Sequence, residues 1–215
     1  AQEEAATEED AQDWAKQALR LLEQAAGDGS VPEESRPLVI SQAVDVAALA
    51  AAQDAGAQAE SVSIPPQQRA AAEELLEWEY TQLFGLDFAR SYASPEMEKD
   101  IDQRLEMHER RVLVLQAALE QLAKSADSAK ENVTVPQPRP AYTAPAGEKL
   151  PVDAATAQSF VDALGWNDTL KWKQAATAAA QEGQEGIDNG TGKEKANPTG
   201  WLDWLIRTAG QSAAL

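Results

Sequence analysis

One predicted helix carries the only histidine of the chain on its apolar face. Eight residues recur there at steps of three and four, a spacing that places them on one side of an α-helix. They are Met97, Ile101, Leu105, His108, Val112, Leu115, Leu119 and Leu122. His108 therefore stands where a buried apolar side chain is expected. An imidazole enclosed in this way serves as a metal ligand, a proton switch or a hydrogen-bonded core residue.

A carboxylate interrupts the apolar stripe of the preceding predicted helix. Glu79 lies three residues after one leucine of this stripe and four before the next. It precedes Ser94 by 15 residues, and His108 follows Ser94 by 14. If the two helices fold back on each other at Ser94, Glu79 and His108 reach similar depths. We predict a buried, hydrogen-bonded Glu79–His108 pair; the alternative places both at the rim, with Tyr80 in the core instead of Glu79.

These residues are too few for a di-iron centre in a helical bundle. Such a centre takes a Glu from each of two helices and a Glu-x-x-His motif from each of the other two. Leu105 stands three residues before His108, and the chain has no second histidine. A six-ligand site is therefore excluded for a single chain. Glu79 and His108 remain the candidates for a single metal ion, while the expectation is that no metal or other cofactor binds.

Helical periodicity runs through most of the chain, and no convincing alternating strand interrupts it. Five long helices and one short helix are predicted, so the fold class is all-α. The predicted helices cover residues 10–26, 37–55, 66–92, 95–123, 154–180 and 198–208, with a break or kink in the fifth at 165–168. We expect one domain over 1–215, made of the N-terminal helix, a bundle at 37–180, and a glycine-rich loop with a short helix at 181–215.

Prolines define two of the connections. Ser94 and Pro95 supply a hydroxyl cap and a first-turn proline, so the helix that carries His108 starts there. Only two or three residues separate it from the preceding helix, which makes the two an antiparallel hairpin. The segment 132–151 is rich in proline, which favours an extended path over the surface, long enough to cross a bundle.

Small residues mark two places where helices can approach closely. The apolar face of 37–55 consists of Ile40, Ala43, Val44, Ala47 and Ala51. Such a face admits a neighbouring helix at short range, or simply reflects high helix propensity. Gly85 lies inside the helix 66–92, where it costs about 1 kcal/mol relative to alanine. Close packing against this glycine is the expected reason for its presence.

Tryptophan supplies much of the bulk that an alanine-rich core lacks. The six tryptophans are Trp14, Trp78, Trp166, Trp172, Trp201 and Trp204. Most are predicted to be large core residues. Trp201 and Trp204 either dock the last helix onto the bundle or form an exposed patch for a partner or for self-association.

Composition excludes several classes of function. The 215 residues carry a formal net charge of −18 and no cysteine. The charge argues against nucleic-acid binding, which needs clustered basic residues. Without cysteine there is no disulfide, thiolate nucleophile or zinc finger. No run of 18 apolar residues is present, so no membrane span is expected. The chain starts with Ala1 and an acidic segment, from which we expect export after removal of a signal peptide.

Three segments resemble a known family. EWEYTQLFGLDFARSYA (Glu77–Ala93), MHERRVLVLQAAL (Met107–Leu119) and PAYTAPAGEKLPVDAATAQSFVDAL (Pro140–Leu164) are similar to a ferritin-like four-helix domain of unknown function in actinobacterial exported proteins. The similarity covers about residues 66–180. It implies a four-helix bundle, a crossover through the proline-rich stretch, and export. It implies no activity, because the family itself is uncharacterised.

Two functional hypotheses follow from these observations. The first is a non-enzymatic binding or structural module of the cell envelope, acting through an unknown protein partner or through self-association. The alternative is a bundle that binds a metal or small ligand through Glu79 and His108, with Trp78, Tyr80 and Tyr92 lining a pocket. Catalysis has little support in the residues, since one histidine leaves little for a catalytic triad.

Overall fold

The computed structural model describes residues 2–27, 31–51, 61–124, 135–144, 148–188 and 200–215. Within these ranges the chain is helical and contains no strand, which confirms the all-α prediction. The α-helices are α1 (Gln2–Gly27), α2 (Arg36–Ala51), α3 (Arg69–Arg90), α4 (Pro95–Lys124), α5 (Ala154–Asp188) and α6 (Trp201–Ala214). Short 3-10 helices, η1 (Glu33–Ser35) and η2 (Pro66–Gln68), precede α2 and α3.

The chain divides into two compact units. The central unit is Gln58–Asp168, and the terminal unit combines Ala1–Ala57 with Thr169–Leu215. In the terminal unit α2 packs against α1 and α6. The sequence analysis expected this helix to form a bundle with the three helices that follow it, and that bundle stays a prediction. Small residues on both helices allow α2 and α6 to approach closely.

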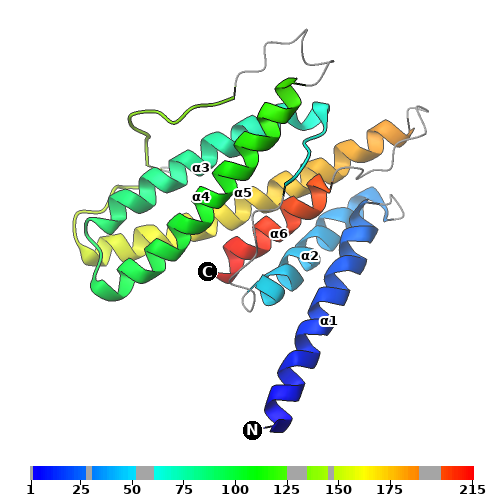
Figure 1. Cartoon of the computed structure of the whole chain (residues 1–215), viewed down its shortest axis with the longest axis horizontal. Coiled ribbons are helices and arrows are strands. Elements are labelled where there is room, and N and C mark those ends of the chain that lie inside the picture. Colours follow the sequence, from blue (N-terminus) through cyan, green and yellow to red (C-terminus); the bar gives the residue numbers. More distant parts are fainter. Residues whose placement is uncertain (1, 28–30, 52–60, 125–134, 145–147, 189–199) are drawn as a thin grey trace. The chain divides into compact units, whose positions relative to one another are not determined.

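The central unit is built on the α3–α4 hairpin, in which the two helices lie side by side (Figure 1). The predicted start of α4 is correct, because the Ser94 hydroxyl accepts a hydrogen bond from the Met97 amide at 3.4 Å and Pro95 opens the helix. Arg90 Nε donates to Asp102 Oδ1 at 2.8 Å and so links the two helices near the turn. This hairpin brings the faces that carry Glu79 and His108 together.

Two glycines of the central unit lie where another helix packs closely. A Cβ at Gly85 would stand 3.2 Å from Leu164 Cδ1 and 3.4 Å from Phe160 Cε1, both on α5. The expected close packing at Gly85 is therefore present. A Cβ at Gly165 would stand 2.5 Å from Nη1 of Arg104, which is buried beneath it. At these positions the first half of α5 packs closely against α3 and α4.

The predicted break in α5 at 165–168 is wrong, because the helix continues through Gly165 as far as Asp188. The absence of a side chain at Gly165 leaves room for Arg104, and the glycine does not end the helix. The predicted loop at 181–200 is also wrong in its first part, which belongs to α5. Glutamine- and glutamate-rich sequence with good helix propensity extends the helix there despite its glycines. Residues 189–199 of that predicted loop lie outside the described ranges.

In the terminal unit, α2 and α6 approach at a glycine. A Cβ at Gly210 would stand 2.5 Å from Ala47 Cβ and 2.8 Å from both the Ala47 carbonyl carbon and the Ala48 nitrogen. Small side chains on α2 therefore do admit a close neighbour. A second link joins α1 to α6, since Arg207 Nε donates to the buried Glu23 carboxylate at 2.8 Å.

Three of the six tryptophans are buried, two are exposed, and Trp78 is partly buried. Trp172, Trp201 and Trp204 are buried in the terminal unit, where Trp204 stacks on Trp201 and meets Trp172 edge-on. Trp201 and Trp204 thus dock α6 rather than form an exposed patch. The expectation that most tryptophans are core residues fails for Trp14 and Trp166, whose exposed fractions are 71% and 74%.

Within the proline-rich connection, residues 135–144 have no regular secondary structure and lie against α3. Its residues contact three positions of that helix: Arg139 Nη2 donates to Glu77 Oε1 at 2.8 Å, Pro136 O accepts from Tyr80, and the Tyr142 ring lies 5.9 Å from Phe84. The polar contacts hold the segment in place without regular backbone pairing.

Asp153 and Thr156 form a reciprocal cap at the start of α5. The Asp153 carboxylate accepts hydrogen bonds from the Thr156 hydroxyl at 2.7 Å and the Thr156 amide at 2.9 Å. The Thr156 hydroxyl oxygen in turn accepts one from the Asp153 amide at 3.1 Å. Chiefly because of the hydroxyl bond, the pKa of Asp153 lies below its ordinary value of 3.8.

We expect Asp153→Ala to lower the thermal midpoint at neutral pH, and this deficit to disappear in acid. Because the folded pKa is depressed, the carboxylate stabilises the fold above its unfolded pKa, and this stability is lost as pH falls through the folded pKa. Thermal melts between about pH 7 and about pH 2 measure the deficit. A deficit that stays constant over that range would rule out the charged cap as its source. Asp162→Ala, at an exposed position of the same helix, is the control.

Candidate functional site

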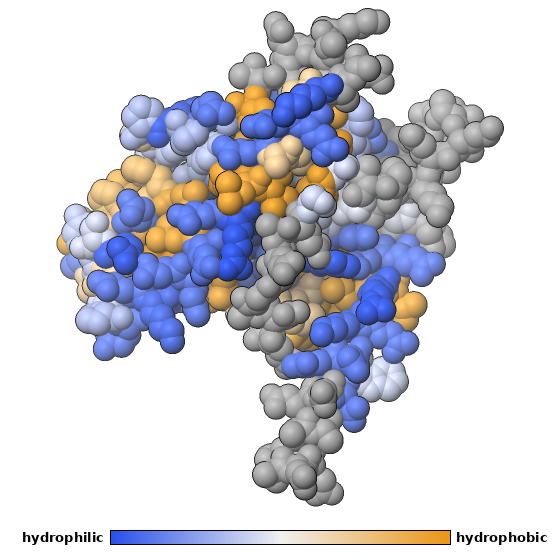
Figure 2. Space-filling view, viewed as in Figure 1, coloured by the Kyte–Doolittle hydropathy of each residue, from blue (hydrophilic) through white to orange (hydrophobic). Residues whose placement is uncertain are grey.

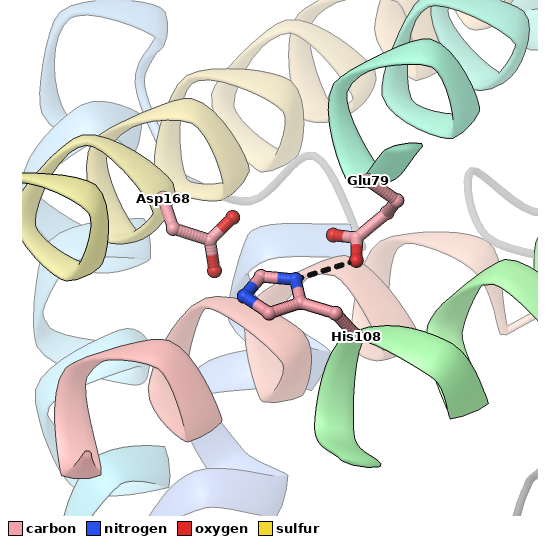
Figure 3. A group of neighbouring side chains, drawn as sticks. All are labelled: Glu79, His108 and Asp168. Atoms are coloured by element: carbon pink, nitrogen blue, oxygen red, sulfur yellow. Dashed lines mark hydrogen bonds and ion pairs between the residues drawn. The ribbon is translucent and has the colours of Figure 1, made fainter. Parts of the chain in front are cut away.

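The structure brings Glu79 and His108 together in the core of the central unit. Glu79 comes from α3 and His108 from α4, and Nδ1 of the imidazole lies 2.7 Å from Oε2 of the carboxylate (Figure 3). Glu79 is 0% exposed and His108 is 3% exposed. The rim alternative is therefore not what the structure shows. Tyr80 is buried as well, on another side of α3, where it faces the proline-rich segment.

Asp168 is a third member of this cluster, and the sequence analysis missed it. It projects from α5 toward Glu79 and His108, and it is 1% exposed (Figure 3). The signal was present, because Asp168 follows the buried Leu164 by four residues and precedes the buried Trp172 by four. A continuous helix would have put it on the apolar face. Because a break was predicted at 165–168, the position of Asp168 on the apolar face was not recognised.

Arg111 supplies the permanent positive charge of the cluster. Its Nη1 donates to Asp168 Oδ2 at 2.9 Å and lies 3.7 Å from Glu79 Oε1. Arg111 follows His108 by three residues, so the two side chains share one face of α4. The sequence analysis did not single out Arg111, because a basic residue beside an apolar seam is usually solvated. Here it is 3% exposed.

A tryptophan completes the hydrogen bonding of Asp168. Trp78 Nε1 donates to Asp168 Oδ1 at 2.8 Å, across the gap between α3 and α5. Each oxygen of Asp168 therefore has a donor, the indole on one side and the guanidinium on the other. The arrangement fixes the orientation of the carboxylate, and it ties α5 to both α3 and α4.

The cluster gathers four ionisable side chains where solvent is nearly absent. Moving a carboxylate or a guanidinium into such surroundings costs several kcal/mol per ion unless partners with good geometry compensate. Glu79 and Asp168 each contribute a negative charge, and Arg111 contributes one positive charge. The guanidinium alone leaves an excess negative charge beside His108. A bound cation would balance this charge.

Glu79 keeps one oxygen without a hydrogen bond. Within the described ranges, Oε1 of Glu79 is buried and accepts none, although Arg111 lies 3.7 Å away. One turn further along the same face of α3, the side-chain amide of Gln82 is also buried with no hydrogen-bond partner among the described residues. Buried polar atoms of this kind are uncommon and costly. These atoms leave unused hydrogen-bonding capacity in the core of the central unit.

The donor set suits a metal ion in type and spacing. Glu79, His108 and Asp168 each offer one ligand atom, and these atoms all lie within 4.8 Å of one another. Imidazole nitrogen with carboxylate oxygens is a set that zinc, manganese and ferrous iron accept.

The aromatic residues expected to line a pocket do not share one place. Trp78 reaches Asp168, whereas Tyr80 bonds to Gln116 and to the backbone of Pro136. Tyr92 is 36% exposed at the end of α3 and contacts the Phe88 ring. Of the three, only Trp78 has a described contact with the buried cluster.

Tyr80 should ionise later than an ordinary tyrosine. Burial is the main cause that raises its pKa above the ordinary value of 10.0. Its phenol contributes fully to stability below pH 10.0, and this contribution is lost as pH rises through the folded pKa. We expect Tyr80→Phe to abolish the latest phenolate transition in an ultraviolet titration, while Tyr142→Phe retains it. A latest transition that survives Tyr80→Phe would contradict this assignment.

Comparisons with protein-family models, with curated proteins and with solved structures find no match for this chain.

Proposed function

We propose that this chain is a non-enzymatic structural or binding module of the cell envelope, with a ferritin-like arrangement of helices. The observation that carries the proposal is the mutual pairing of Glu79, His108, Arg111 and Asp168 in the core. These groups contact one another across three helices and are at most 3% exposed. The cluster then sets how the helices pack.

Burial of the cluster is the argument against catalysis. A general acid or base must come within hydrogen-bond reach of the substrate proton that it transfers. The single histidine is engaged with Glu79, and the side-chain exposed fractions of the pair are 4% and 0%. A role in holding the helices at one register requires no such access. Buried ionic groups act in this way in some proteins, at a cost in stability.

The envelope assignment rests on composition and on the resemblance to exported ferritin-like domains. A net charge of −18 favours solvation and repulsion between copies. On the face shown in Figure 2, hydrophilic residues cover much of the surface, with apolar residues in patches between them. Among the described residues, no helix combines the length and apolar character that a bilayer crossing requires. Any partner is a protein or a second copy of the chain rather than nucleic acid.

A complementation experiment tests the structural role. A deletion strain receives either the wild type or a variant in which the cluster is apolar (Glu79→Leu, His108→Leu, Arg111→Met and Asp168→Leu together). Replacing a complete buried ionic group with apolar residues is often neutral or stabilising. We expect both proteins to fold, to fractionate with the envelope or the medium, and to restore envelope integrity equally.

Two results would overturn this proposal. One is a folded apolar variant that reaches the same fraction but fails to restore the strain, since the cluster would then perform chemistry rather than support the fold. The other is wild-type protein found only in the cytoplasm. Circular dichroism of the purified variant establishes that it is folded before the strains are compared.

A further inference from the structure

We propose that Glu79, His108 and Asp168 form a binding site for one divalent metal ion, and that Arg111 competes with the metal for the two carboxylates. The inference goes beyond the structural role above and does not depend on it. The three candidate ligands come from three different helices, and their ligand atoms lie within 4.8 Å of one another. In Figure 3 the three side chains converge on one region between α3, α4 and α5.

A second observation points to a ligand at the same place. Glu79 is 0% exposed, yet its Oε1 accepts no hydrogen bond from the described residues. This oxygen is turned toward Asp168 rather than away from the cluster (Figure 3). A buried carboxylate oxygen without a donor is costly, and a metal ion would satisfy it.

The donor set narrows the kind of metal. One imidazole nitrogen and two carboxylate oxygens suit zinc, manganese or ferrous iron, and the chain has no cysteine to recruit a softer ion. Calcium commonly takes six to eight oxygen ligands, which is more than this cluster offers. Three protein ligands are typical of sites that keep a position for water. Three ligand atoms are enough for one ion and too few for two.

Arg111 gives this site a distinctive signature. Its guanidinium partly neutralises the carboxylates that a metal must use, through the 2.9 Å contact with Asp168 and the 3.7 Å contact with Glu79. A divalent ion arriving beside it meets a positive charge in surroundings that screen poorly. Metal binding by the wild type is therefore weaker than its donors alone would give. Removing the guanidinium should strengthen metal binding, whereas it should destabilise the metal-free fold.

The test is titration of zinc and of manganese into untagged, chelator-free protein, followed by calorimetry. We expect one ion per chain for the wild type, a loss of affinity of at least about tenfold in His108→Gln and in Asp168→Asn, and a gain of about tenfold in Arg111→Met. Glu23→Gln is the matched control, because Glu23 is a buried carboxylate paired to an arginine in the terminal unit. It should bind as the wild type does.

X-ray absorption of the zinc-loaded wild type keeps the proposal testable if a variant fails to fold. Imidazole scattering can arise only from His108, since the chain has one histidine. We expect one imidazole and otherwise oxygen ligands. The proposal is overturned if neither the wild type nor Arg111→Met binds either metal, if His108→Gln binds as tightly as the wild type, or if the bound zinc shows no imidazole.

Discussion

Asp168→Ala is expected to lower the free energy of unfolding of the metal-free protein by about 3–5 kcal/mol. The substitution removes the acceptor of the Arg111 guanidinium and of the Trp78 indole together. The guanidinium is then left in a space from which water is largely excluded, and the indole is partly buried. The effect is large because the buried guanidinium loses its 2.9 Å hydrogen bond, while Glu79 lies 3.7 Å away, beyond hydrogen-bond distance. Urea denaturation followed by circular dichroism measures the change.

Asp162→Ala is the control for this experiment, since Asp162 lies on the same helix, is exposed, and accepts a hydrogen bond from Gln158 on the surface. Its expected effect is within about 0.5 kcal/mol. The four-residue apolar replacement of the cluster should be far better tolerated than Asp168→Ala alone. If Asp168→Ala were as mild as Asp162→Ala, the buried cluster would not hold the central unit together.

Gly210→Ala is expected to destabilise the protein by about 2–3 kcal/mol, through overpacking where α6 crosses α2. The new Cβ would lie 2.5 Å from Ala47 Cβ and 2.8 Å from backbone atoms of Ala47 and Ala48. Backbone cannot turn aside as a flexible side chain can, so the two helices must separate. Alanine gains about 1 kcal/mol over glycine in helix propensity, and that gain opposes the steric cost without cancelling it. Thermal and urea unfolding measure the net effect.

Gly85→Ala provides the comparison for Gly210→Ala. Its Cβ would meet the end of the Leu164 side chain at 3.2 Å, and this side chain can shift. The gain in helix propensity and the crowding should nearly balance, which leaves a net change within about 1 kcal/mol. Equal effects at both glycines would show that the close approach of α2 and α6 is absent in solution.

Much of the central hairpin could be predicted because its signals are local. The apolar seam that includes Ile101 and Leu115 has the period of a helix, and Ser94 with Pro95 marks its start. A short loop then forces α3 and α4 to lie antiparallel, and nearly equal distances from the turn bring Glu79 opposite His108. Each step depends on residues close in sequence or on simple geometry.

The rest of the site depends on contacts that are distant in sequence. Asp168 reaches the cluster only if α5 continues through Gly165, and a glycine followed closely by Asn167 and Asp168 suggests a break. The compensation comes from Arg104, which occupies the space over this glycine. Arg111 was hidden for a related reason, since nothing near it in the sequence shows that its partners are Asp168 and Glu79.

The neighbours of α2 could not be predicted from its own pattern. A face of small residues such as Ala43 and Ala47 fits any helix that offers a complementary surface. The choice of α6 depends on Gly210, which stands 163 residues after Ala47. Pairing over such a distance is specified by shape at the contact and not by periodicity.

The most direct test of the buried cluster is the reactivity of the single histidine toward diethyl pyrocarbonate, read by mass spectrometry of the peptide that contains His108. In the native protein His108 should react far more slowly than in the same protein unfolded in urea, because the residue is 3% exposed and its Nδ1 is bonded to Glu79. Native His108 that reacts as fast as in the unfolded chain would contradict the buried cluster, and with it both the structural role and the metal site.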